Sequence, residues 1–180
     1  MKEYNLEGFE RGLAELGIAL SEEQKTQFLQ YYALLVEWNS FMNLTAITEF
    51  DQVITKHFLD SLSLVKVCDV AQAGRILDVG TGAGFPGIPL KIAFPEVEVV
   101  LLDSLNKRVK FLNEVIGQLG LSKITAIHGR AEDFARQKEY REQFDLVVSR
   151  AVANLSSLSE YCLPYVKVGG RVGSYKSGKL

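Results

Sequence analysis

The stretch Ile76–Pro89, which reads ILDVGTGAGFPGIP, decides the fold of this chain. A short apolar run carries one acid, Asp78, and then breaks into a loop with glycines at positions 80, 82, 84 and 87. Glycine lets a backbone turn tightly and approach a ligand closely. A helix-like stretch, Gly87–Phe94, follows, and the first turn of a helix offers unpaired N–H groups. The sequence therefore predicts a strand, a loop and a helix that hold a nucleotide-like cofactor.

The glycines allow two interpretations. Gly82–Gly87 fits G-x-G-x-x-G, the dinucleotide fingerprint, which is a weak signal on its own. The second frame, Asp78-x-Gly80-x-Gly82-x-Gly84, resembles the first motif of class I S-adenosylmethionine methyltransferases. Either cofactor needs an acid at the end of the next strand to hold ribose hydroxyls. Asp103 follows the apolar run Val97–Leu102 and serves both interpretations, so it does not discriminate between them.

Two other features favour the methyltransferase frame. A pyrophosphate would sit at the start of the helix, but Phe85 and Pro86 crowd that place and Pro86 has no N–H to donate. After the apolar run Ile124–Ile127, the stretch His128–Asp133 puts acids where class I methyltransferases contact adenine. A Rossmann oxidoreductase that uses NAD remains the less favoured alternative.

Composition limits the class of protein. With 180 residues and 47% hydrophobic content, we expect one domain with a real core and a small appendage. The net charge of −2 gives no general sign of nucleic-acid binding. No signal peptide and no membrane-length apolar run are present, and Cys68 and Cys162 lie in unrelated segments. These features predict a cytoplasmic chain with reduced thiols and no metal site.

Helical spacing dominates the first part of the chain. The predicted segments are a first helix that stops near Gly17, a second that starts at the capping box Ser21–Gln24, and a third over Phe50–Val67. A boundary near Gln72–Arg75 separates a helical region, residues 1–72, from an α/β core, residues 73–180.

Strands and helices alternate in the core. The predicted strands are Arg75–Val79, Val97–Leu102, Ile124–Ile127, Phe144–Ser149 and Arg171–Tyr175. The predicted helices are Gly87–Phe94, Asn106–Leu119, a short one near Glu132–Gln137, and Leu155–Leu163. Apolar strands separated by helices predict a Rossmann-like parallel sheet with helices on both faces. We expect the ligand at the carboxyl ends of these strands, near the switch in strand order.

The class I methyltransferase sheet has two strands more than we predict. Without them, Arg171–Tyr175 would be an exposed apolar edge, which invites aggregation. Either the chain is truncated at its C-terminus and the last two sheet strands are missing, or this edge pairs with something else; we favour truncation.

Several stretches outside the glycine loop point to one family. They are VEWNSFMNLTAIT (Val36–Thr48), KHFLDSL (Lys56–Leu62), LLDSLNKRVKFL (Leu101–Leu112), HGRAED (His128–Asp133) and FDLVVSRAVANL (Phe144–Leu155). With the loop, they resemble the RsmG (GidB) family of bacterial 16S rRNA methyltransferases. The resemblance implies S-adenosyl-L-methionine as the methyl donor and a guanine N7 in the decoding-region loop of 16S rRNA as the target. It implies the 16S rRNA or the small ribosomal subunit as partner, no membrane, no metal, and action as a monomer.

The same resemblance implies the site residues. The expected cofactor contacts are Gly80, Phe85, Asp103, Ala131, Glu132 and Arg150. Arg150 and His57 are the candidates for a catalytic role. Arg150 can serve the carboxylate end of the cofactor, an RNA phosphate or guanine O6. His57, with Asp60 and Ser61, either lines the mouth of the pocket or forms a local hydrogen-bonded link. For Asp78, organising the loop and binding the amino end of the cofactor both stay open.

A guanine N7 carries a lone pair and no proton, so its methylation requires alignment and no general base. The sequence agrees, since no Asn/Asp-Pro-Pro-Tyr/Phe motif follows the fourth predicted strand. The alternative is a truncated chain that binds the cofactor and no longer catalyses.

Overall fold

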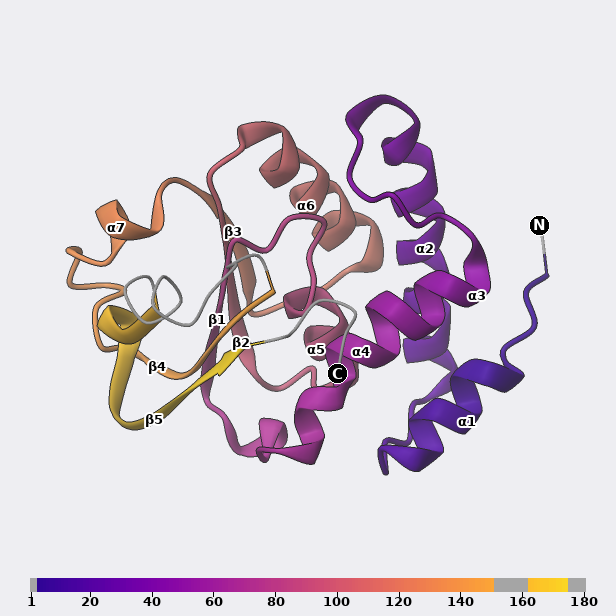
Figure 1. The fold of residues 1–180 in the computed structure, drawn as a ribbon, viewed down its shortest axis with the longest axis horizontal. Helices are drawn as coiled ribbons and strands as arrows, with labels where there is room; N and C mark the ends of the chain where they lie inside the picture. The colour runs from indigo at the N-terminus through magenta and orange to yellow at the C-terminus, as the bar shows by residue number, and fades with distance from the viewer. Residues whose placement is uncertain (1–2, 151–161, 175–180) are drawn as a thin grey trace.

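The structure is a computed structural model that describes residues 3–150 and 162–174. Within these residues, a parallel five-stranded sheet has helices on both faces, and an N-terminal helical region packs to one side of it (Figure 1). No helix in the described part is long and apolar enough to cross a membrane.

The N-terminal region begins with α1 (Glu7–Glu15) and α2 (Glu22–Met42). The predicted capping box is confirmed, because the Gln24 N–H donates to Ser21 Oγ (3.1 Å) and the Ser21 N–H donates to Gln24 Oε1 (2.7 Å). Gly17 follows the end of α1 with a φ of 71°, the left-handed conformation that glycine adopts without strain. Both signals were readable because caps depend on local sequence.

The segment Phe50–Val67 is helical as predicted, but it is not one uniform α-helix. The chain forms α3 (Phe50–Val53), a π-helical turn (Ile54–Leu59), α4 (Asp60–Leu62) and a 3₁₀ turn (Ser63–Lys66). In the π turn, Phe58 is fully buried and His57 stacks on Phe85 of the glycine loop. Tertiary packing therefore accompanies a departure from the α-helical period that the sequence pattern predicted.

The sheet has the order β3-β2-β1-β4-β5, and every neighbouring pair is parallel. Its strands are β1 (Arg75–Val79), β2 (Glu98–Asp103), β3 (Ile124–His128), β4 (Phe144–Ser149) and β5 (Val166–Ser174). Four predicted strands match within one residue at each end. The fifth was wrong at its start, Arg171, because the register between β4 and β5 shifts beside Gly169 and Gly170, which interrupt the apolar pattern.

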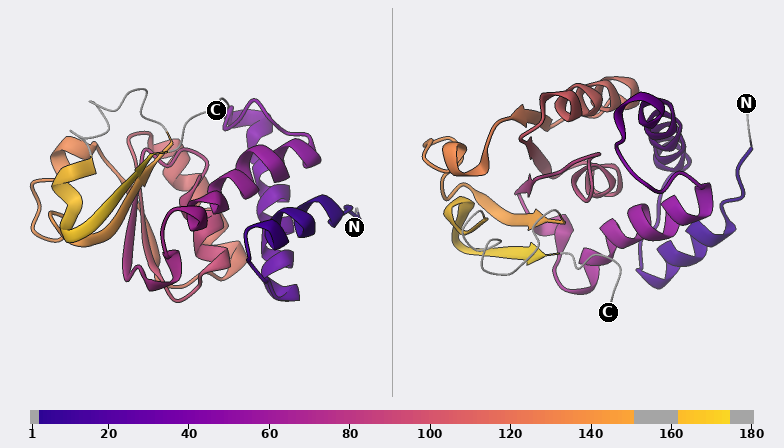
Figure 2. Two further views of the ribbon diagram at one scale, coloured as in Figure 1. Left: turned by 60° about the horizontal axis from the view of Figure 1, so that its bottom comes forward. Right: turned by 45° about the horizontal axis from the view of Figure 1, so that its top comes forward.

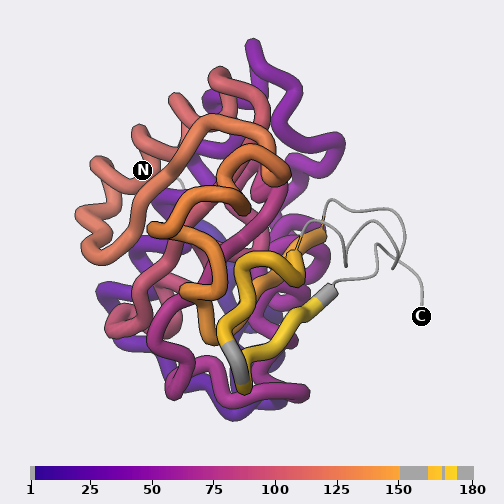
Figure 3. The backbone as a smooth tube through the Cα atoms, turned by 90° about the vertical axis from the view of Figure 1, so that its left-hand side faces the viewer, coloured from indigo at the N-terminus to yellow at the C-terminus, as the bar shows by residue number. Residues whose placement is uncertain are grey.

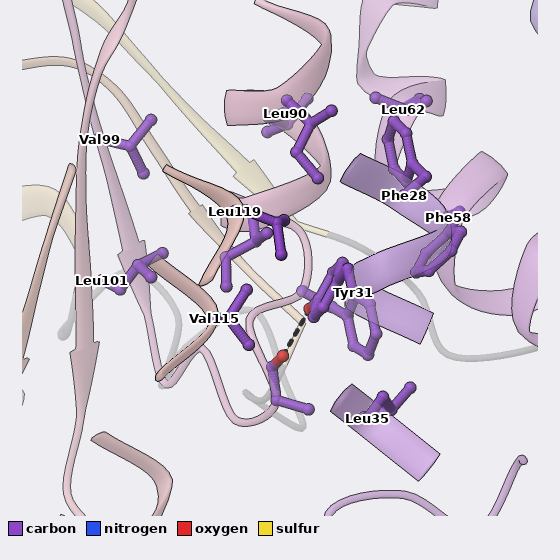
Figure 4. Packing of buried hydrophobic residues seen from close by; sticks show 14 of the residues in the cluster. Phe28, Tyr31, Leu35, Phe58, Leu62, Leu90, Val99, Leu101, Val115 and Leu119 are labelled. Carbon is purple, nitrogen blue, oxygen red and sulfur yellow. Dashed lines mark hydrogen bonds between the residues drawn. The ribbon is translucent and has the colours of Figure 1, made fainter. Parts of the chain in front are cut away.

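Successive side chains along each strand point to opposite faces of the sheet and pack into two separate hydrophobic cores. Ile76, Leu101 and Val148 face the core shared with α2, α5 (Gly87–Ala93) and α6 (Asn106–Leu119), where Figure 4 shows the packing around Tyr31. Leu77, Val100 and Val147 face the other core, beside α7 (Ala131–Phe134) and Tyr165. Figure 2 shows helices on both sides of the sheet, which confirms the predicted three-layer arrangement.

The strand order places a ligand site. β1 lies between β2, which follows it in the chain, and β4, so the switch in strand order falls between β1 and β4. β5 lies outside β4, at the edge nearest the viewer in Figure 3. Most of the predicted helix Leu155–Leu163 falls outside the described residues.

Candidate active site

The loop after β1 is fastened by Asp78. This side chain is fully buried, and its Oδ2 accepts hydrogen bonds from Thr81 Oγ1 (2.7 Å) and from the Gly87 N–H (2.9 Å). Asp78 therefore organises the loop, one of the two roles that the sequence left open. Its Oδ1 is buried with no hydrogen-bond partner among the described residues. Burial raises the pKa of Asp78 to about 7, although the two hydrogen bonds act in the opposite direction.

Six N–H groups of the loop are occupied by the chain itself. They are those of Gly80 and Thr81 on Leu102 O (2.8 and 3.1 Å), Gly82 on Asp103 Oδ2 (2.8 Å), Gly84 and Phe85 on Thr81 O (3.0 and 3.1 Å), and Gly87 on Asp78. Pro86 has none to offer. A pyrophosphate needs such donors unpaired at the start of the helix. The carboxylate of Asp78 holds the donor that a phosphate would use, so this loop is poorly suited to a dinucleotide.

A pocket of about 260 Å³ opens at the carboxyl ends of β1, β2 and β3. Its lining residues are Val79, Gly80, Leu102, Asp103, Ser104, Gly129, Arg130, Ala131 and Glu132. The structure thus brings together four of the six predicted cofactor contacts: Gly80, Asp103, Ala131 and Glu132. Sequence reasoning missed Leu102 and Ser104, which line the pocket by position at the end of β2 and carry no distinctive chemistry.

Asp103 is the buried acid among the lining residues of this pocket, with 2% of its surface exposed. Its Oδ1 accepts from the Leu105 N–H (2.9 Å), its Oδ2 accepts from the Gly82 N–H (2.8 Å), and Arg108 lies 3.6 Å away. Each carboxylate oxygen accepts more than one hydrogen bond. Asp103 can therefore hold the loop and still accept hydroxyl groups of a ligand.

The wall formed by β3 and α7 depends on a close approach of backbone and ring. A Cβ at position 129 would lie 1.9 Å from the Phe134 ring, so any larger residue there would displace that ring. His128 contacts the Ser104 carbonyl through Nε2 (3.1 Å) and serves the wall as a structural residue. Glu132 pairs with Arg130 (3.1 Å) at the exposed rim.

The other two predicted cofactor contacts, Phe85 and Arg150, are not among the lining residues of this pocket. The Phe85 ring is 6% exposed and stacks on His57, with centroids 4.3 Å apart and planes at 10°. The Arg150 guanidinium carbon lies 5.5 Å from the same ring centroid. Phe85 and Arg150 therefore lie near His57 and not in the lining of the pocket.

Arg150 follows directly after β4, whose last residue, Ser149, donates from Oγ to Val79 O (2.8 Å) and so ties β4 to β1. The guanidinium donates to Lys56 O (3.2 Å) and Ser61 Oγ (3.5 Å), and it lies 3.5 Å from Asp60 Oδ2. We call His57, Asp60, Ser61, Phe85 and Arg150 the Arg150 cluster.

Two titratable side chains of the Arg150 cluster, His57 and Asp60, have shifted pKa values. Burial, and then the charge of Arg150, lower the pKa of His57 to about 4, so this imidazole is uncharged at pH 7. Its Nε2 contacts Thr45 Oγ1 (2.9 Å). Burial raises the pKa of Asp60 above its usual range, although Arg150 opposes that shift.

Comparison with known proteins gives a family. The family model GidB, rRNA small subunit methyltransferase G, matches residues 24–180. Ribosomal RNA small subunit methyltransferase G of Lachnoclostridium phytofermentans is 62% identical over 172 residues, which cover 96% of this chain and 71% of the relative. The protein of the same name from Clostridium kluyveri is 56% identical over 156 residues, which cover 87% of this chain and 66% of the relative.

Solved structures give the fold. P. horikoshii TYW2 in complex with MeSAdo has a TM-score of 0.53 at 17% identity, over 66% of this chain and 41% of that one. TrmN from Thermus thermophilus has a TM-score of 0.52 at 22% identity, over 63% of this chain and 36% of that one. At these identities the likeness establishes the architecture alone.

Proposed function

This chain belongs to the family of ribosomal RNA small subunit methyltransferase G, and we propose that it methylates N7 of a guanine in 16S rRNA. Membership confirms the family, the fold class, the class of enzyme and the methyl donor, S-adenosyl-L-methionine, that the sequence predicted. The chain spans 71% and 66% of the two relatives, so the activity of this chain itself is our proposal. We place the reaction in the bacterial cytoplasm, on the decoding-region loop of the small subunit, with the chain acting as a monomer.

The observation that carries the proposal is the pairing of a closed loop with an acidic pocket. Six N–H groups of the loop bond to Leu102, Asp103, Asp78 and the loop's own turn, which leaves few donors for a pyrophosphate. The pocket beside it offers buried carboxylate oxygens, which suit ribose hydroxyls. This combination favours an adenosine with no phosphate, as in the methyl donor, over NAD.

The residues divide the work of holding that adenosine. Asp103 accepts from the ribose hydroxyls, while Ala131 and Glu132 contact the adenine from the start of α7. Gly80, with a φ of 67°, lets the backbone turn beside the ligand. When bound, S-adenosyl-L-methionine supplies a methyl group activated by a positive sulfur.

The chain's task at the reacting atoms is alignment. Guanine N7 presents a lone pair without a proton, so no side chain has to remove one. His57 fits this requirement, since a pKa of about 4 makes it a weak base. We infer that the Arg150 cluster orients the base and that catalysis follows from position and exclusion of water.

The direct test is methyl transfer to small ribosomal subunits that lack the modification. With tritiated S-adenosyl-L-methionine, we expect the label in 16S rRNA at a guanine that then cleaves under conditions specific for 7-methylguanine. No incorporation by a chain that still binds S-adenosylhomocysteine would overturn the proposal and leave the non-catalytic cofactor-binding chain in its place. Binding of NADH in preference to S-adenosylhomocysteine would instead support the oxidoreductase.

The role of Asp103 has its own test. Wild-type protein should bind S-adenosylhomocysteine about 10-fold or more tightly than its 2′-deoxy analogue, because the analogue lacks a hydroxyl that donates a hydrogen bond to a buried, charged carboxylate. Asp103→Asn should reduce that preference to about 2-fold or less, measured by calorimetry. An equal preference in both proteins would reject the ribose contact, even if the variant weakened binding of both ligands through its effect on the Gly82 N–H.

A further inference from the structure

Within the described residues, the polar contacts of Arg150 come from one direction, while the Phe85 ring of the glycine loop lies 5.5 Å from its guanidinium carbon. Its three polar partners, Lys56 O, Asp60 Oδ2 and Ser61 Oγ, all belong to the π-helical turn and the start of α4. The arginine itself stands one residue beyond β4, at the switch point of the sheet. It thus connects the helical region to the place where ligands bind in such sheets.

The ion pair between Arg150 and Asp60 is expected to contribute little to the stability of the fold. The side chains of Arg150 and Asp60 are 20% and 38% exposed and their charged atoms are 3.5 Å apart, a geometry that contributes little to folding. The helical region is already joined to the sheet by buried contacts, among them the Tyr31 hydroxyl, which donates to Ala83 O at 2.5 Å (Figure 4). The ion pair therefore needs another explanation.

The chemistry of the proposed target supplies one. Arginine commonly contacts guanine by donating to both N7 and O6. Here N7 must keep its lone pair for the methyl group, so only O6 is open to a donor. O6 also separates guanine from adenine, which carries an amino group at that position. A guanidinium has five N–H groups, and two hydrogen bonds and one ion pair still leave donors for a base.

Charge explains why the arginine is paired. The methyl donor is cationic and 7-methylguanine becomes cationic, so a bare guanidinium beside them would oppose the reaction. Asp60 compensates that charge locally. The ring of His57 adds none, because it is neutral at pH 7.

We propose that Asp60 and Arg150 act as one guanine-selecting pair, in which Arg150 donates a hydrogen bond to O6 of the target base. Asp60 is a positioning residue that aims the guanidinium and balances its charge. The inference rests on the proposed function, and it assigns Arg150 to the base, one of the three ligands that the sequence left open.

The first test compares Asp60→Asn and Arg150→Lys with a matched control, Glu98→Gln. Glu98 belongs to a half-exposed ion pair with Arg75 at the opposite ends of the strands. Both cluster variants should lower kcat/KM for small subunits by roughly 10- to 100-fold, the usual loss for a charge-assisted hydrogen bond. Their affinity for S-adenosylhomocysteine and their melting temperatures should stay at those of the control. A loss of kcat/KM only in proportion to a lower melting temperature or weaker cofactor binding would overturn the pair and leave a structural link.

The second test needs no turnover. In the presence of S-adenosylhomocysteine, wild-type protein should bind guanosine 5′-monophosphate more tightly than adenosine 5′-monophosphate, as followed by NMR titration. Asp60→Asn and Arg150→Lys should remove that preference, while Glu98→Gln keeps it. A wild-type protein without the preference, or variants that retain it, would refute the selecting pair. Absence of methyl transfer by wild-type protein would refute only the proposed function.

Discussion

At the scale of single residues, two acids of the same kind have different tasks because their surroundings differ. One oxygen of Asp78 accepts hydrogen bonds from both ends of the loop. Asp103 accepts a hydrogen bond from the loop and also lines the pocket. The sequence placed Asp103 at the end of a strand, and the structure has it in the pocket lining there, because the ends of parallel strands meet at one edge. It left Asp78 ambiguous, since no pattern of residue types tells which lone pairs the backbone will occupy.

The raised pKa of Asp78 makes a prediction about pH. Folding raises this pKa from 3.8 to about 7, so the folded state binds the proton more tightly. The resulting stabilisation is present below pH 4 and is lost as the pH rises through 7. Asp78→Asn does not titrate, so its melting temperature should gain on the wild type between pH 4.5 and 7 and then run parallel to it.

Asp145→Asn is the control for this measurement. Burial raises the pKa of Asp145, but hydrogen bonds from Lys167 and the Arg75 N–H outweigh it and hold that pKa below 3.8. The Asp145→Asn curve should therefore stay at a constant offset from wild type above pH 4.5. If the Asp78→Asn curve also kept a constant offset, Asp78 would be ionised across the whole range.

At the scale of elements, local signals were readable and packing was not. The cap of α2 and the whole of α6, Asn106–Leu119, were predicted correctly, because both follow from residues adjacent in sequence. The π-helical turn was missed, and its residues contact the ring of Phe85 and the guanidinium of Arg150, which lie far away in sequence. The π-helical turn carries His57 of the Arg150 cluster. The geometry of this cluster depends on tertiary contacts, so it was the part of the site that sequence predicted least well.

Two glycines on different helices should respond oppositely to alanine. Gly117 lies inside α6, and a Cβ there meets no atom within 4 Å, so Gly117→Ala should stabilise the protein by about 0.5–1 kcal/mol. At Gly87, the first residue of α5, a Cβ would lie 2.3 Å from Leu101 Cδ2 and 3.0 Å from Asp78 Oδ2. Gly87→Ala should therefore destabilise by about 1–3 kcal/mol. Urea unfolding measures both changes, and a shift of the same sign in the two variants would contradict the packing described at Gly87.

At the scale of the whole molecule, the predicted helical region and α/β core share their interior. Phe28 and Phe58 belong to the same buried cluster as Ile76 and Leu101 of the sheet. The sequence predicted helices in one region and a sheet in the other, but it could not show that the two regions bury their apolar side chains in the same core. Long-range contacts of this kind couple the Arg150 cluster to the strand ends.

A shared core predicts a single cooperative transition. Trp38, the one tryptophan of the sequence, lies on α2 with its ring 5.7 Å from Phe111 of α6, so its fluorescence reports on the junction of the two regions. Its urea transition should coincide with that of far-ultraviolet circular dichroism. Tyr31→Phe removes the donor to the buried Ala83 carbonyl and should shift both transitions together by about 1–3 kcal/mol. Two separated transitions, or a shift in fluorescence alone, would mean that residues 1–72 unfold independently and that the helical region holds its half of the site without the support of the sheet.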